Sequence, residues 1–180
     1  MIMTESRRGL LTYIGAFAAL TATAPLLAAC AGPGGGAGSD SGQGLLKIEE
    51  TPASQATKDL WAASQSGDVA AVKAALAAGA DIEGIDFSEN HNGRRALNYA
   101  ALNDKADVIE VLLAAGANIE SENRTRFHPL HHAAEAGSIN AIKMLLKHGA
   151  DKRAKMYRGG IPQQIAEFKG HREAALLLVP

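Results

Sequence analysis

The sequence predicts an all-α solenoid in which about three and a half to four helix–turn–helix units of 33 to 37 residues stack on one another. The tripeptide Gly79-Ala80-Asp81 recurs, with 37- and 33-residue spacings, as Gly116-Ala117-Asn118 and Gly149-Ala150-Asp151. A Leu-x-x-Ala element precedes each copy at the same spacings, starting at Leu60, Leu97 and Leu130. Since no single helix pair buries its apolar face alone, neighbouring units must share one core.

The units follow one another at about residues 57–89, 93–125, 126–158 and 159–180. In the first unit, Thr57 is the expected helix N-cap. Between the first two units, four additional residues within 86–93 lengthen the loop. The second unit carries Asp104 where the others have glycine, so we expect a less relaxed turn between its two helices.

Helix ends can be read from glycine and proline. Gly79, Gly116 and Gly149 each follow an apolar stripe, where a left-handed residue commonly ends a helix. Pro129 and Pro162 suit the first turn of a helix, where no amide donor is needed. The last unit ends in apolar residues 176–179, so its final helix is expected either to fray or to meet a membrane or a partner.

Residues 128–137 read His-Pro-Leu-His-His-Ala-Ala-Glu-Ala-Gly, which follows the pattern Thr-Pro-Leu-His-x-Ala-Ala-x-x-Gly with His128 in the Thr position. Together with the Gly-Ala-Asp stop, this motif resembles the ankyrin repeat, and the resemblance covers residues 57–180. It implies an ankyrin-repeat domain without catalytic activity that binds another protein through β-turn finger tips and the concave face of the first helices.

The resemblance also implies which positions dock a partner. At the finger tips these are His91, Asn92, Arg94, Arg124, Thr125, Phe127, Tyr157 and Arg158. At the ends of the concave helices they are Leu102, Asn103, Glu135, Phe168 and Lys169. Phe127 and Phe168 have two interpretations, because an aromatic ring rimmed by arginine suits a binding hot spot and also suits packing between fingers.

Charge is balanced overall, at a formal −1, but divided along the chain. Residues 40–123 carry fourteen acidic and six basic residues, whereas residues 124–172 carry ten basic and three acidic ones. We therefore expect a strong dipole along the solenoid and a partner with an acidic face. A solvated surface without function and anionic lipid headgroups are the open alternatives. No nucleic acid and no small-molecule substrate is expected.

Residues 1–29 have the basic start, apolar centre and small-residue end of a secretory signal peptide. The ending Leu-Ala-Ala-Cys resembles a bacterial lipobox, which implies that Cys30 is the first residue of the mature chain and carries a lipid. An uncleaved membrane anchor and a plain signal peptide are the alternatives. Ser6-Arg7-Arg8 further resembles a twin-arginine signal, with the general secretory route as its alternative.

The segment 30–56 is rich in Gly and Ser at its start and is predicted to be a flexible tether. The expected location is the bacterial cell envelope, with the chain lipid-anchored and facing the periplasm. Because Ala31 rather than Asp follows the cysteine, the outer membrane is favoured in a cell with two membranes.

Four of the six histidines lie in the third unit, at positions 128, 131, 132 and 148. They raise the alternative of a metal- or haem-handling envelope protein. Three of them have a structural explanation as well: His128 as a helix cap, His131 as a hydrogen-bond partner of the adjoining finger backbone, which the resemblance implies, and His148 at a helix C-terminus. No Cys or carboxylate lies at zinc-ligand spacing, and no nucleophile or phosphate-loop motif is present, so we predict no metal, no cofactor and no enzyme.

Overall fold

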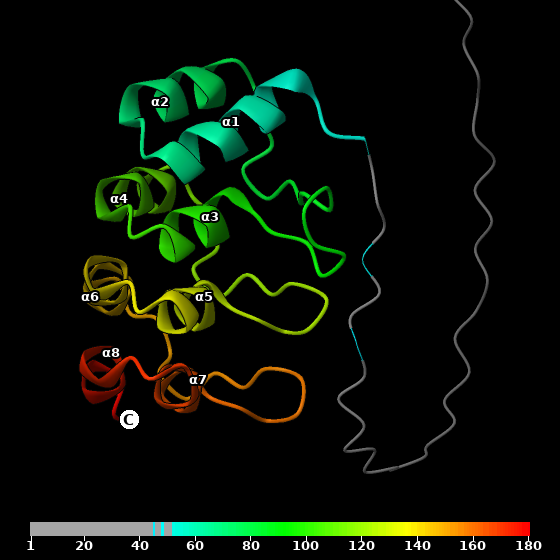
Figure 1. Ribbon diagram of the computed structural model, residues 1–180. Helices are drawn as coiled ribbons and strands as arrows, with labels where there is room; N and C mark the ends of the chain where they lie inside the picture. Colours follow the sequence, from blue (N-terminus) through cyan, green and yellow to red (C-terminus); the bar gives the residue numbers. More distant parts are fainter. Residues whose placement is uncertain (1–44, 46–47, 49–51) are drawn as a thin grey trace, which may run out of the picture. The chain divides into compact units, whose positions relative to one another are not determined.

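The computed structural model describes residues 45, 48 and 52–180, and its helices form four stacked pairs (Figure 1). The pairs are α1 (Gln55–Ser66) with α2 (Val69–Ala77), α3 (Ala96–Leu102) with α4 (Ala106–Ala114), α5 (Pro129–Ala136) with α6 (Ile139–Lys147), and α7 (Pro162–Lys169) with α8 (Arg172–Leu177). The predicted all-α solenoid is confirmed for the described residues. The signal peptide predicted at 1–29 and the predicted lipidation site Cys30 lie outside them, as does most of the segment predicted to be a tether.

The helices form two layers. The inner helices α1, α3, α5 and α7 pack against one another in that order, and the outer helices α2, α4, α6 and α8 do the same. The loops that join successive pairs project to one side of the stack (Figure 1). We call them finger one (residues 83–95), finger two (120–128) and finger three (152–161). Order in space therefore equals order in the chain.

One apolar register repeats through the core. In the inner layer, Leu60, Leu97 and Leu130 occupy equivalent positions and are no more than 2% exposed. In the outer layer, Leu112, Leu145 and Leu178 are equivalent and fully buried. Burying one such side chain stabilises the fold by about 1.5–3 kcal/mol, which secures the short helix α8. Of the two alternatives for the last helix, the buried Leu178 speaks against fraying, and contact with a membrane or a partner stays a prediction.

The first helix begins one turn earlier than expected. Ser54, not Thr57, is the N-cap of α1, and its hydroxyl accepts a 3.2 Å hydrogen bond from the Thr57 backbone N–H. The Thr57 side chain is buried and has a different role, because its hydroxyl accepts a 3.0 Å hydrogen bond from the Asp81 N–H. It thereby fixes the loop that follows α2.

Glycine and proline mark helix ends as predicted. Gly79, Gly116 and Gly149 follow the outer helices with φ of 82°, 95° and 89°. A Cβ at any of the three would meet nothing within 4 Å, so only the left-handed backbone calls for glycine there. Pro129 and Pro162 are the first residues of α5 and α7.

Finger one is the longest of the three. Asp86 and Arg94 form an isolated antiparallel bridge at its base, through backbone hydrogen bonds of 2.8 and 2.9 Å. The residues between them make the predicted longer loop. Gly93 has φ of 77°, and a Cβ there would lie 2.5 Å from Ile85 and 2.6 Å from Phe87, so the loop closes tightly over these two side chains.

Candidate functional site

The finger tips form a continuous row. The backbone N–H of Arg124 donates to the carbonyl of Asn92 over 3.0 Å, and the N–H of Tyr157 donates to the carbonyl of Thr125 over 2.8 Å. Fingers one, two and three are therefore tied edge to edge. The structure thereby brings the predicted tip residues of the three fingers to the one side of the stack from which these loops project (Figure 1).

Finger two is shaped by Asn123, a buried residue that sequence reasoning missed. Its Oδ1 atom accepts hydrogen bonds from the N–H of Thr125 at 2.9 Å, the hydroxyl of Thr125 at 2.7 Å and the N–H of Phe127 at 2.9 Å. This arrangement holds Arg126 at φ 57°, a conformation that costs a side-chain-bearing residue free energy. The signal available in the sequence was an Asn two residues before a Thr in a loop.

Arg124 is engaged within the finger surface. Its guanidinium lies 4.3 Å from the centre of the Phe87 ring, and its Nη1 donates to the carbonyl of His91 over 2.9 Å. Its Nη2 donates to the carbonyl of Ile48 over 3.0 Å. The carbonyl of a residue outside the repeats thus contacts this finger tip.

The two phenylalanines separate into different environments. Phe127 is half-buried, and its ring centre lies 5.3 Å from that of His131 and 5.2 Å from that of His132. This ring packs at the base of finger two. Phe168, at the end of α7, is 88% exposed. An aromatic ring exposed to that extent is a candidate anchor for a partner.

The concave helix ends carry the other predicted positions. Lys169 Nζ lies 3.0 Å from Glu135 Oε1, so these two predicted residues form an ion pair between α7 and α5. The side-chain amide of Asn103 donates a 2.9 Å hydrogen bond to the carbonyl of Tyr99. The carbonyl of Leu102 accepts a 3.0 Å hydrogen bond from the Ser138 hydroxyl. The Leu102 carbonyl therefore helps to join the second repeat to the third, whereas the Asn103 side chain caps the end of its own helix α3.

Arg94 and Arg158 lie in different fingers. Arg94 forms a 3.4 Å ion pair with Glu89 and lies 5.7 Å from the centre of the Tyr99 ring. Arg158 is exposed at the tip of finger three with φ of 82°. A non-glycine residue in the left-handed region is uncommon and often belongs to a functional loop.

The third repeat's histidines have structural contacts. His131 Nε2 lies 3.3 Å from the carbonyl of Gly160, as the resemblance implied, and its Nδ1 accepts from the His128 N–H over 3.2 Å. His128 is the N-cap residue of α5, as expected, but its side chain makes no cap hydrogen bond, because the ring is turned toward the acidic residues of finger two. It lies 2.9 Å from Glu120 Oε2 and 3.4 Å from Glu122 Oε1.

His131 and His132 are held neutral. Burial, aided by the nearby His128, lowers the pKa of His131 to about 4. Burial, followed by the charge of Arg94 and then His131, lowers the pKa of His132 to about 3, and neither ring nitrogen of His132 has a hydrogen-bond partner. Across the described residues, no three His, Cys, Asp or Glu side chains are grouped to hold a metal ion, so the metal or haem alternative gains no candidate site there.

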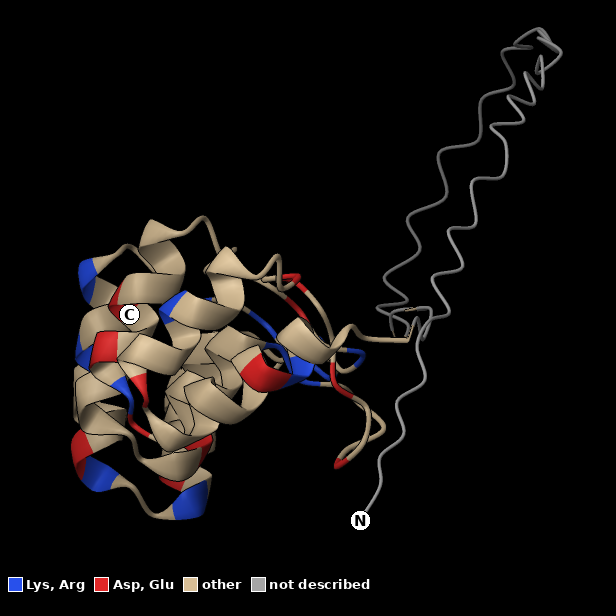
Figure 2. Cartoon of the chain, turned by 90° about the horizontal axis from the view of Figure 1, so that it is seen from above, with Lys and Arg blue, Asp and Glu red and all other residues tan. Residues whose placement is uncertain are grey.

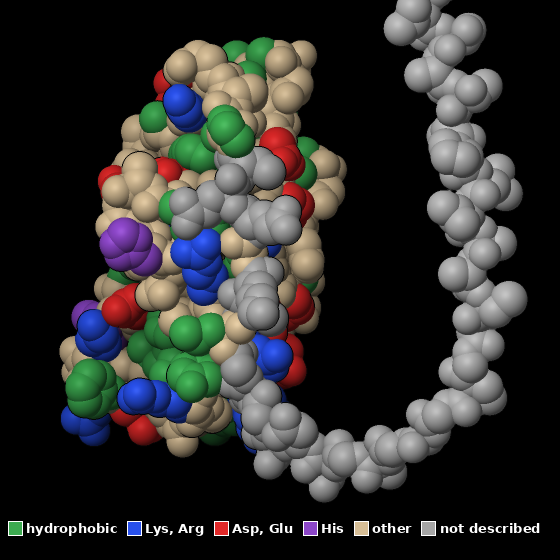
Figure 3. All heavy atoms as spheres, turned by 90° about the vertical axis from the view of Figure 1, so that its right-hand side faces the viewer, with side chains coloured by type: hydrophobic (Ala, Val, Ile, Leu, Met, Phe, Trp, Pro, Cys, Tyr) green, Lys and Arg blue, Asp and Glu red, His purple; other side chains and the backbone are tan. Residues whose placement is uncertain are grey.

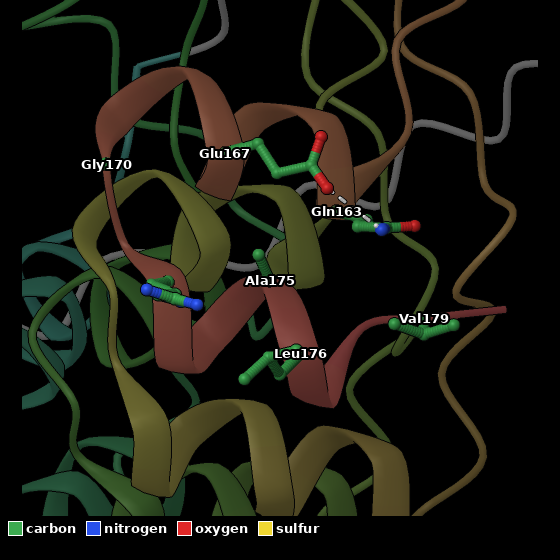
Figure 4. A pocket seen from close by; sticks show the side chains of 7 residues that line it. Gln163, Glu167, Gly170, Ala175, Leu176 and Val179 are labelled. Atoms are coloured by element: carbon green, nitrogen blue, oxygen red, sulfur yellow. Dashed lines mark hydrogen bonds between the residues drawn. The ribbon is translucent and has the colours of Figure 1, made fainter.

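An apolar hollow lies at the open end of the stack, where a further repeat would pack. It has a volume of about 340 Å³ and is lined by residues of α7 and α8 together with Val179. Figure 4 shows Leu176 and Val179 at its mouth, and a 3.0 Å hydrogen bond joins Gln163 to Glu167 on α7. The side chains of Leu176 and Val179 are 69% and 50% exposed.

The division of charge persists in the folded chain. Residues 52–123 contain eleven acidic and five basic residues, whereas residues 124–180 contain ten basic and four acidic ones. Charged residues lie along the helices and in the fingers (Figure 2). Because the repeats stack in chain order, acidic residues are in excess toward one end of the solenoid and basic residues toward the other. Figure 3 shows hydrophobic side chains beside Lys and Arg toward the α7 end.

Within the part of the chain that the structure describes, no helix has the length and apolar character to cross a bilayer. The predicted signal peptide and its alternative, an uncleaved anchor, both fall on residues 1–29, which lie outside that part.

Comparison with known proteins gives relatives over the same region. Human cyclin-dependent kinase 4 inhibitor B is 34% identical over 117 residues, which are 64% of this chain and 81% of that protein. Inversin of Gallus gallus is 30% identical over 126 residues, covering 69% of this chain and 11% of inversin. Inversin of Danio rerio is 42% identical over 66 residues, covering 37% of this chain and 6% of inversin. The chain thus spans only a small part of the two inversins.

A family model described as ankyrin repeats in three copies matches residues 60–156, which is more than half of the chain. The family and these relatives suggest a role in protein–protein interaction. The matched residues are those whose helices stack as repeat pairs, and the chain belongs to the ankyrin-repeat family.

Proposed function

We propose that this protein is a non-catalytic binding module, held at the bacterial cell envelope by a lipid on Cys30, that engages an acidic face of another protein. The surface that binds is the carboxyl-terminal half of the finger row together with the concave end of α7. Cyclin-dependent kinase 4 inhibitor B is by its name an inhibitor of another protein, which supports a binding role for a related array.

Phe168 is the observation that carries the proposal. Its side chain is 88% exposed on the inner helix α7, although large apolar side chains cost free energy when left in water. Lys169 follows it directly, and finger three of the same repeat presents Lys155 and Arg158, both exposed. An exposed aromatic anchor in a repeat that also presents basic side chains suits a partner with acidic groups around an apolar pocket.

The partner's charge follows from the field of the molecule. The carboxyl-terminal half has an excess of basic residues that do not all pair within the fold, whereas the amino-terminal half is acidic. Such a field orients an approaching acidic surface toward fingers two and three and raises the association rate. Screening by salt shortens its reach to about 8 Å at physiological ionic strength, so the encounter is salt-dependent.

Capture in the envelope followed by a purified binding measurement tests this function. The full chain is crosslinked in cells, the partner is identified and purified, and its Kd is measured for the unchanged chain, Phe168→Ala and Arg158→Glu. We expect each variant to weaken binding at least tenfold, equal to about 1.4 kcal/mol. Lys143→Glu, a charge reversal on the outer helix α6, is the matched control and should leave Kd within twofold.

Unchanged affinity in both Phe168→Ala and Arg158→Glu would overturn the docking surface. The envelope anchor is tested separately by Cys30→Ser, which should release the chain from the membrane fraction and abolish incorporation of labelled fatty acid. Membrane retention of a cleaved Cys30→Ser chain would contradict the anchor and leave the binding proposal in place.

A further inference from the structure

A second concave feature lies at the opposite, acidic end of the solenoid. A groove of about 310 Å³ runs between α1 and finger one. Its lining includes Trp61, Ala62 and Gln65 from α1, Tyr99 from α3, and Asp86 and Glu89 from finger one. Gln65 is one of the concave-helix positions that the family resemblance implies, whereas the other five residues lie outside those positions.

The aromatic walls of the groove are fixed in place. Trp61 is only 8% exposed, and its indole Nε1 donates to the carbonyl of Gly84 over 3.1 Å. Tyr99 is 2% exposed, and its hydroxyl donates to Asp86 Oδ2 over 2.9 Å. Both side chains are therefore rigid and almost fully buried, so the groove has a fixed shape and needs little ordering to bind.

The carboxylates of the groove are also held in place. Although burial acts to raise the pKa of Asp86, hydrogen bonds from Ser88 and Tyr99 and the charge of Arg94 outweigh it and hold that pKa below its ordinary value. Glu89 Oε2 lies 3.4 Å from the Tyr99 hydroxyl, and half of the Glu89 side chain is exposed. Both groups thus present acceptor oxygens beside the aromatic walls.

The four-residue insertion explains why this groove exists. It falls within residues 86–93, and Ser88 and Glu89, which line the groove, belong to that stretch. Fingers two and three are shorter by these residues and carry no equivalent of them. The feature that makes finger one irregular is therefore the feature that builds its acidic wall.

We propose that the groove between α1 and finger one binds the guanidinium of an arginine side chain presented by a protein partner. This inference rests on the proposed binding function and extends it. A planar guanidinium donates to carboxylates through paired N–H groups, and the wall formed by Asp86 and Glu89 supplies such acceptors inside a groove of fixed shape. The groove's charge complements a cation and repels the acidic face that suits the other end.

Two cations of this chain border the site. Arg94 pairs with Glu89 at 3.4 Å, a contact long enough for an incoming guanidinium to share that carboxylate. Lys58 lines the rim from α1 and is exposed. Its charge opposes an arriving arginine, so removing it strengthens binding. With arginine at the amino-terminal groove and acidic groups at the carboxyl-terminal fingers, the partner binds in a single orientation.

The only tryptophan of the sequence reports on this groove directly. The full chain is titrated with the peptide acetyl-Gly-Arg-Gly-amide while Trp61 emission is recorded. The same peptide with citrulline in place of arginine is the control, because citrulline keeps the shape and loses the charge. We expect a saturable emission change with the arginine peptide and at least fivefold weaker binding with the citrulline peptide.

Variants assign the response to the carboxylate wall. Glu89→Gln should weaken binding of the arginine peptide at least fivefold, and Lys58→Gln should strengthen it about twofold. Lys143→Gln on α6 should leave this binding unchanged. Ala62→Leu, at an exposed position on α1, fills the groove and should abolish the response while the melting temperature is retained.

Equal responses to the arginine and citrulline peptides, or no effect of Glu89→Gln, would overturn the inference. That failure together with intact partner binding would leave the proposed function standing. The reverse result, an arginine response in a chain that captures no partner, would retain the groove and reject the proposed function.

Discussion

The Oδ1 atom of Asp104, in the turn between α3 and α4, accepts a 2.8 Å hydrogen bond from the backbone N–H of Ala141 at the start of α6. Its Oδ2 atom accepts from the Asn140 side chain over 2.8 Å. Asp104 has φ of 56°, so the second repeat accepts an unfavourable turn conformation and gains a cap on the next repeat. The aspartate that replaces the usual glycine at this turn therefore links the second repeat to the third.

Two variants separate these contributions. Asp104→Ala keeps the left-handed turn and loses the cap, so we expect the free energy of unfolding to fall by about 1–2 kcal/mol. Asp104→Gly loses the same cap and relieves the backbone, so its loss should be no more than about 0.5 kcal/mol. Urea unfolding followed by circular dichroism measures both. Equal losses would show that the cross-repeat bond, not the backbone, sets the stability of this turn.

Replacing each of the two phenylalanines by alanine should change the stability of the protein to a different extent, because the two rings differ in burial. Phe127→Ala removes a half-buried ring that packs on His131 and His132, and we expect it to cost about 2 kcal/mol. Phe168→Ala removes an exposed ring and should change the free energy of unfolding by less than about 0.5 kcal/mol. A comparison of thermal midpoints checks both. A large loss in Phe168→Ala would show that this ring serves the fold.

The buried histidines predict sensitivity to acid. The pKa values of His131 and His132 are lowered to about 4 and about 3, so both stay neutral in the fold while the unfolded chain takes up protons below about pH 6.5. The contribution of the two neutral histidines to the free energy of unfolding is therefore fully present above that pH. It is lost as the pH decreases toward their pKa values in the folded chain. Each histidine contributes a slope of about 1.4 kcal/mol per pH unit between its two pKa values.

His132→Leu tests this assignment. The variant removes two buried nitrogens without hydrogen-bond partners, so we expect it to be more stable at pH 7 by about 1 kcal/mol and to lose less stability between pH 6.5 and 4. Urea midpoints across this pH range measure the difference. An unchanged pH slope in His132→Leu would mean that other groups cause the acid sensitivity.

The repeat register was predictable from sequence because it depends on local chemistry. The 33-residue spacing that relates Leu112 to Leu145 also reaches Leu178, and the same buried position recurs in each helix pair. The glycines that follow the outer helices were predictable because a left-handed backbone position at a helix end favours glycine. The N-cap was misassigned because Ser54 and Thr57 both offer a hydroxyl, and only the contact of Thr57 with Asp81 shows which one the loop requires.

The finger surface was less predictable because its contacts join residues far apart in the chain. The bond from Arg124 to Ile48 spans 76 residues, and no local pattern indicates it. His128 occupies a capping position in sequence, yet the acidic residues of finger two determine where its ring turns. The insertion in finger one was visible as a change of spacing, but the groove that it builds depends on how that loop folds against α1.

Hydrogen exchange of the full chain, with and without its purified partner, tests most directly the claim that the fingers and the inner helix α7 dock another protein. The account predicts slower exchange in finger three and at the end of α7, with α2, α4 and α6 unchanged. Protection confined to those outer helices, or no protection in residues 152–169, would contradict it.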